Sequence, residues 1–143
     1  MTLSLGLFAG IIFFVYSVYF IKIIKGTPED FEGEILESLA EWMISKGSAS
    51  KGQMWILLLL SVLLEVAYFT LVFYGINNLT IIVFTLFFAV IEMYHLAMLS
   101  HSLNRFFKGK IVIKKIFNWK LERLSAMLFF THSLLILLLL IFF

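Results

Sequence analysis

The chain has 143 residues, of which 62% are hydrophobic and 14% are charged, with a formal net charge of +2 and a mean hydropathy of +1.05. A soluble domain of this length has too little interior to bury that much apolar surface. The chain has no cysteine, which excludes disulfides, thiolate nucleophiles and cysteine-bound metal clusters. Its apolar residues fall in long blocks, which predict an all-α integral membrane protein.

The first apolar block, residues 3–24, predicts a helix that spans the membrane. Composition then changes at Gly26. Thr27 suits the N-cap of a new helix, and Pro28 suits its first position. We therefore expect a second, amphipathic helix over residues 28–46.

This amphipathic helix carries an apolar stripe and an acidic surface. The stripe consists of four residues at helical spacing: Phe31, Ile35, Leu39 and Trp42. Helices that lie on membranes are usually rich in Lys and Arg because they bind anionic lipid. An acidic helix is better suited to a protein surface. Residues 47–52 follow as a short, flexible connector rich in Gly and Ser.

Three further spans are predicted, over residues 53–74, 79–104 and 121–143. Residues 75–78 are too few to form a domain, so the second and third spans form a tight antiparallel hairpin. Residues 105–120 form a basic connector. The predicted fold is a bundle of four transmembrane helices with one short amphipathic helix.

Every Lys and Arg lies in or beside the first and third connectors. The positive-inside rule then places both charged connectors in the cytoplasm and both termini outside the cell membrane. The acidic helix and the basic connector share one side in this topology. Attraction between them would explain the acidic helix, although both could equally be solvated independently.

Ionisable side chains inside the predicted spans are the strongest functional signal. Such groups are expensive in hydrocarbon and usually mark a relay, a pathway or a bound ion. Glu92 and His95 are three residues apart and share one helix face. Glu65, Glu92 and His132 lie equally far from the charged ends of their spans, roughly 18 Å deep and near the middle of the bilayer.

We therefore predict that these groups converge in one polar site. The predicted site consists of Glu65, Glu92, His95 and His132. Four neighbours at a similar depth are expected to support it: Tyr68, Ser61, Tyr16 and Ser17. His101 lies near the interface on another face and is left out.

The first functional hypothesis is proton or cation handling in a transporter, channel or energy-coupling subunit. The second is an intramembrane metal site or metalloenzyme, in which Glu65, Glu92, His95 and His132 hold one divalent transition metal such as Zn, Fe or Mn. Haem between the two histidines is a less favoured variant, because bulky side chains crowd the spans.

The third hypothesis is a non-catalytic accessory or scaffold subunit of a membrane complex, whose polar groups hold its helices together. Besides the lipid bilayer, the expected partners are further copies of the chain or another membrane subunit. A nucleic-acid partner is not expected, because the basic segment is short and is explained by topology.

Overall fold

The computed structural model describes residues 1–143 as an all-α protein, which confirms the predicted fold class. Four of its helices are long and apolar enough to cross a membrane. The elements in chain order are α1 (Thr2–Ile24), α2 (Pro28–Lys46), α3 (Ala49–Gly75), α4 (Leu79–Phe107), the short 3₁₀-helix η1 (Ile113–Lys115) and α5 (Trp119–Phe142).

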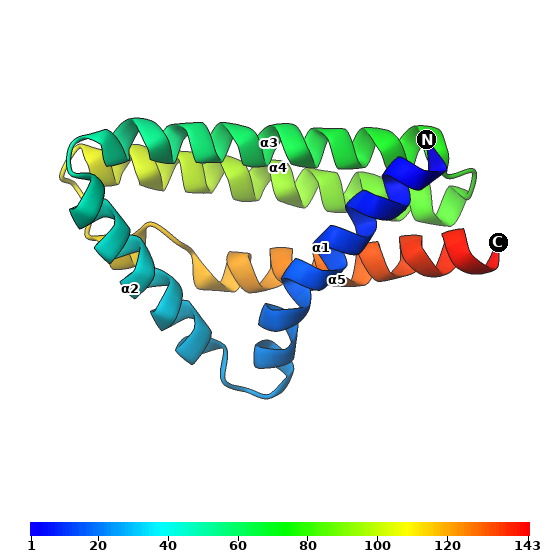
Figure 1. Ribbon diagram of the computed structural model, residues 1–143, viewed down its shortest axis with the longest axis horizontal. Helices are drawn as coiled ribbons and strands as arrows, with labels where there is room; N and C mark the ends of the chain where they lie inside the picture. Colours follow the sequence, from blue (N-terminus) through cyan, green and yellow to red (C-terminus); the bar gives the residue numbers. More distant parts are fainter.

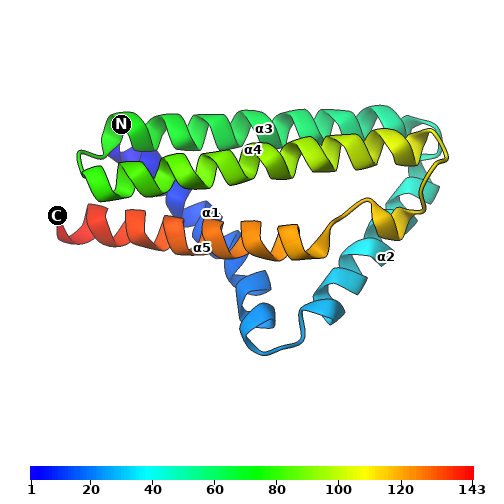
Figure 2. The same cartoon turned by 180° about the vertical axis from the view of Figure 1, so that it is seen from behind.

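Helices α3 and α4 form the predicted antiparallel hairpin and lie side by side along their lengths (Figure 1). The turn ends at Asn78, whose side-chain oxygen accepts a hydrogen bond of 3.1 Å from the backbone N–H of Ile81. This contact satisfies one of the free donors at the start of α4. Helix α5 lies beneath α4 and runs antiparallel to it (Figure 2).

The predicted flexible connector at residues 47–52 is mostly wrong, because α3 already begins at Ala49. Only Gly47 and Ser48 link α2 to α3, and Gly47 has a φ of 59°, which favours glycine. Residues such as Lys51 and Gln53 are good helix formers, so α3 extends beyond its apolar segment. Helix α4 similarly extends to Phe107, and α5 begins at Trp119.

Helix α1 crosses α5 diagonally, whereas α3, α4 and α5 are nearly aligned (Figure 1). Stacked aromatic rings hold the crossing. The rings of Phe13 and Phe20 lie 5.0 and 3.8 Å from that of Phe130, between centroids. Tyr16 stacks on Phe129 at 4.8 Å. Because these α1 residues recur at three- and four-residue spacing, they form one continuous face.

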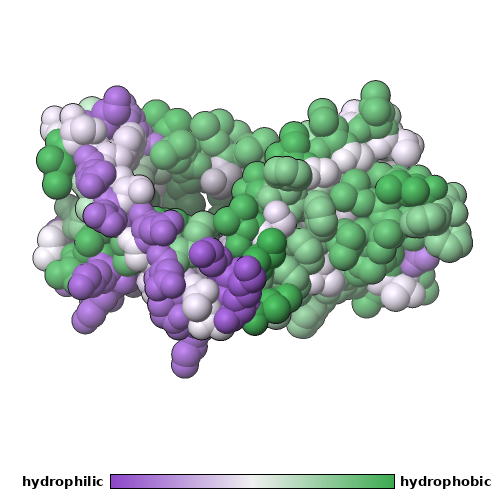
Figure 3. All heavy atoms as spheres, turned by 60° about the horizontal axis from the view of Figure 1, so that its bottom comes forward, coloured by the Kyte–Doolittle hydropathy of each residue, from purple (hydrophilic) through white to green (hydrophobic).

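On the face drawn in Figure 3, most hydrophilic side chains gather at one side, and apolar side chains cover most of the other side. Both termini lie at the end of the α3–α4 turn (Figure 1). The predicted placement of the connectors in the cytoplasm, and of both termini outside, stays a prediction.

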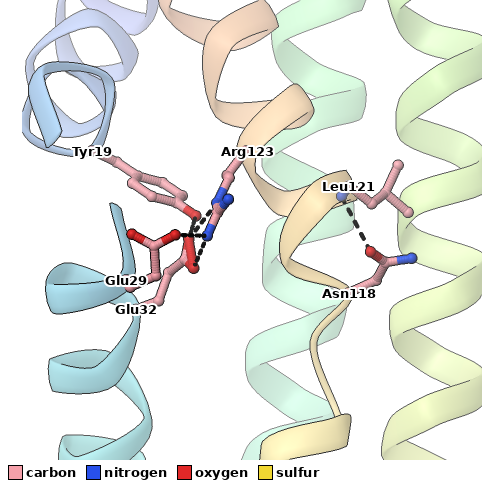
Figure 4. A network of polar contacts seen from close by, with 6 residues as sticks. All are labelled: Tyr19, Glu29, Glu32, Asn118, Leu121 and Arg123. Carbon is pink, nitrogen blue, oxygen red and sulfur yellow. Dashed lines mark hydrogen bonds and ion pairs between the residues drawn. The ribbon is translucent and has the colours of Figure 1, made fainter. Parts of the chain in front are cut away.

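An ion-pair cluster holds α2 against the membrane-spanning helices (Figure 4). The guanidinium of Arg123 on α5 donates two hydrogen bonds to the Glu32 carboxylate, at 2.8 and 2.6 Å. It also donates to Glu29 at 3.2 Å. Tyr19 of α1 donates its hydroxyl to Glu32. Of the two possibilities for the acidic helix, attraction to a basic residue near the third connector is therefore the one observed.

These contacts favour an ionised Glu32. Burial alone would raise the pKa of this carboxyl, but the hydrogen bonds from Arg123 and then from Tyr19 outweigh burial and hold the pKa below its usual value of 4.5. A two-pronged guanidinium–carboxylate pair also fixes orientation. The cluster thus defines where α2 docks.

Candidate functional site

A buried histidine joins two carboxylates that come from different helices. His95 Nδ1 lies 3.1 Å from Glu92 Oε2, one turn earlier on α4. Its other ring nitrogen, Nε2, lies 2.8 Å from Glu122 Oε1, in the first turn of α5. Glu92 is 1% exposed and His95 is 8% exposed. The predicted pairing of Glu92 with His95 is present, and we call these three residues the Glu–His–Glu relay.

The number of protons on the relay decides how many of its contacts are hydrogen bonds. Each of its two nitrogen–oxygen contacts needs one proton to be a hydrogen bond. A neutral imidazole has only one N–H, so with both carboxylates ionised one contact lacks its proton. One added proton completes both bonds, whether it sits on the imidazole or on a carboxyl. The arrangement can therefore take up and release a proton with little movement of heavy atoms.

Glu122 is the member of the relay that sequence reasoning missed. It lies just inside the predicted fourth span, between the basic residues Lys120 and Arg123. An acidic residue in the first turn of a helix is usually explained by the helix dipole. The only signal in the sequence is that Glu122 is a single acid among basic residues at the edge of a span.

His132, predicted to belong to the same site, lies in a separate polar cluster. Its Nδ1 is 2.7 Å from the hydroxyl of Tyr68 on α3, and its Nε2 is 2.8 Å from the hydroxyl of Thr85 on α4. His132 and Thr85 are both fully buried. Thr85 was also missed, although it lies seven residues before Glu92, on the same face of α4. His132 makes no hydrogen bond to the relay.

The hydrogen-bond directions in this second cluster are determined by Thr85. Its hydroxyl donates to the backbone carbonyl of Ile81 at 2.7 Å, so its oxygen accepts from His132 Nε2–H. Nδ1 is then an acceptor for the Tyr68 hydroxyl. A neutral His132 satisfies every one of these groups. The arrangement suits a structural link between α3, α4 and α5.

Glu65 makes no hydrogen bond to either cluster. Together with Ser61 and Tyr16 it lines a groove of about 420 Å³ between α1 and α3. Its Oε2 is buried without a hydrogen-bond partner. Ser17, the remaining predicted supporting residue, donates to the carbonyl of Phe14 at 2.6 Å within α1. The eight predicted residues thus lie in the relay, in the His132 cluster and in the groove, apart from Ser17, whose contact is within α1.

No group of three or more His, Asp or Glu side chains is arranged to hold a metal ion. In the relay, Glu92 lies at Nδ1 of His95 and Glu122 lies at Nε2, on opposite sides of the ring. A metal ion bound to either nitrogen would therefore have only one of the two carboxylates beside it. His132 has hydroxyl partners at both nitrogens. The metal and haem hypotheses are therefore not supported.

A small hollow adjoins the relay at its Glu122 end. Its volume is about 10 Å³, and half of its eight lining residues are polar: His95, Ser102, Asn118 and Glu122. A space of about this size holds one water molecule when several polar groups line it. The relay thus has room for water beside His95 and Glu122.

Comparisons with protein-family models, with curated proteins and with solved structures find no match to this chain. It is a four-span membrane protein with buried salt bridges between glutamate and histidine.

Proposed function

We propose that this protein handles protons, as a transporter, channel or energy-coupling subunit, through the relay of Glu92, His95 and Glu122. The observation that carries the proposal is a buried imidazole bonded through both ring nitrogens to carboxylates. Carboxylates and imidazoles inside a membrane are the groups from which proton relays are built.

The position of the relay supports a path along the membrane normal. Glu122 lies in the first turn of α5, next to the third connector. Glu92 lies near the middle of α4, and its Oε1 is buried without a partner. A proton that reaches Glu122 could pass to His95 and then to Glu92. In this path, the unpartnered oxygen of Glu92 accepts the proton at the end of the relay that lies deeper in the membrane.

The end of the relay at Glu122 has room for water. The hollow beside His95 and Glu122 has room for about one water molecule, which could bring protons to the first carboxylate. Protons are favoured over metal cations because no group of three or more ligating side chains is arranged around one point. Glu65 and His132 are not part of the relay that we propose.

The experiment is proton flux into sealed liposomes that contain the purified protein and an internal pH dye. A pH gradient is imposed, and potassium with valinomycin compensates the charge. We expect Glu92→Gln, His95→Gln and Glu122→Gln each to slow the flux by about tenfold or more, as 1.4 kcal/mol of added barrier would. The matched controls are His101→Gln, an exposed histidine of α4, and Glu41→Gln, an exposed acid of α2.

Two results would overturn the proposal. One is wild-type flux no faster than that of protein-free liposomes. The other is undiminished flux in all three relay variants. Size-exclusion profiles and helix content of every variant exclude loss of folding as the cause. Glu122→Asp, which keeps a carboxyl group, should retain part of the flux.

A further inference from the structure

The groove that contains Glu65 combines long apolar walls with a polar end. Residues of α1 and α3 form most of it, and Phe129 of α5 completes it. The apolar lining residues of the two walls are Leu7, Phe8, Ile11, Ile12, Val15 and Leu64. Four of these side chains are more than half exposed: Leu7, Ile11, Val15 and Leu64. In a four-span membrane protein, such a groove opens to lipid.

The polar groups gather at one end because α1 and α3 run in opposite directions. Leu5 at the start of α1 lies against Gly75 at the end of α3, where a Cβ would come within 3.1 Å of the leucine side chain. Residues later in α1 therefore lie beside residues earlier in α3, and Tyr16 is at the same end of the groove as Glu65 and Ser61. From Leu7 to Tyr16 the wall is about 14 Å long.

The hydrogen-bonding groups at the polar end are incompletely used. Glu65 Oε2 is buried with no partner in the chain. Tyr16 makes no side-chain hydrogen bond, although its ring stacks on Phe129. Ser61 donates to the Leu57 carbonyl at 3.0 Å, which leaves its oxygen free to accept. Buried polar groups in proteins nearly always have a partner, and hydrocarbon cannot provide one.

We propose that this groove binds a lipid-soluble alcohol, with its hydroxyl at Glu65 and Tyr16 and its apolar body along α1 towards Leu7. A hydroxyl can donate to the Glu65 carboxylate and accept from Tyr16 at the same time, whereas an ammonium group can only donate. The volume of about 420 Å³ lies within the range of small-molecule sites, about 300–1,000 Å³. This inference is independent of the proton relay.

The test uses dodecanol that carries a photoreactive diazirine near the tail end. The wild-type protein is placed in phosphatidylcholine nanodiscs, irradiated, and mapped by mass spectrometry. We expect labelling to concentrate on the apolar groove residues of α1. Excess dodecanol should abolish this labelling. Dodecyl methyl ether, which has no O–H to donate, and dodecylammonium should compete poorly.

Substitutions then separate the head-group contact from the groove. Glu65→Leu should reduce labelling about tenfold, the loss expected for a buried hydrogen bond to a carboxyl group. Glu65→Gln, which keeps an acceptor oxygen, should retain it. Ser61→Phe should block the groove. Leu59→Phe, on the same helix but outside the lining, is the matched control.

Three outcomes would overturn the proposal. The first is labelling spread evenly over the lipid-facing residues and unaffected by Glu65→Leu and Ser61→Phe. The second is equal competition by the methyl ether, which would mean that only the apolar walls bind. The third is stronger competition by dodecylammonium, which would assign the groove to cations. Labelling that persists in Glu122→Gln would separate this site from the relay.

Discussion

The two buried histidines illustrate how the same side chain serves different purposes in different surroundings. His132 contacts two hydroxyl groups, and Thr85 determines the direction of every hydrogen bond around it. His95 contacts two carboxylates, and the protons that complete both bonds can sit on the imidazole or on a carboxyl. Around His132, one placement of the protons satisfies every hydrogen bond. Around His95, several placements do so, and they differ little in geometry.

A histidine inside a membrane is therefore not by itself a proton relay. Neutral partners with fixed donors make it a structural link between helices. Acidic partners at both nitrogens are groups of the kind from which proton relays are built. Substitution of each histidine should therefore affect different properties of the protein.

The largest expected effect on stability is that of His132→Ala. It removes two buried hydrogen bonds and leaves a cavity among α3, α4 and α5, so we expect the free energy of unfolding to fall by about 2 kcal/mol. Unfolding by increasing dodecyl sulfate in mixed micelles measures this change. Thr131→Ala, at an exposed neighbouring position, is the control. Equal stability of the two variants would contradict the structural role of His132.

A smaller effect is expected at the ion pair that docks α2. Arg123→Gln should weaken docking by about 1 kcal/mol, the upper end for ion pairs with access to solvent. Hydrogen exchange of the α2 amides measures docking, and Lys120→Gln is the control at an exposed neighbouring position. Unchanged exchange in Arg123→Gln would show that other contacts hold α2.

This docking should also depend on pH. Because the Arg123 and Tyr19 hydrogen bonds hold the pKa of Glu32 below 4.5, the stabilisation is complete above pH 4.5 and is lost as the pH falls through the lowered pKa. Once exchange is corrected for its intrinsic pH dependence, the protection of the α2 amides is therefore expected to fall at low pH in the wild type. The pH dependence should be reduced in Arg123→Gln. Equal pH dependence in both proteins would exclude Glu32 as the titrating group.

The smallest structural effect is expected of Glu122→Gln. The amide can still hydrogen-bond to His95 but cannot take up its proton, so stability should change by less than about 1 kcal/mol. The side-chain ¹⁵N signals of His95 should shift, whereas those of His132 stay in place because its partners are unchanged. Equal shifts at both histidines would show that the two clusters are coupled.

The sequence by itself determined the four spans, the α3–α4 hairpin and the amphipathic α2. These depend on local signals: apolar length, a short turn, and Pro28 at the start of a helix. It also determined that Glu92 and His95 contact each other, because residues three apart on a helix are neighbours. All of these features are set within one helix or between consecutive ones.

Only the tertiary structure decided how each span is rotated about its axis. A helix that is apolar all round has no amphipathic stripe to show which side faces its neighbours. Depth along the membrane therefore put His132 level with Glu92 but could not show that it faces Tyr68 and Thr85. The same rotation of α5 brings Glu122 to His95, which no spacing in the sequence indicates.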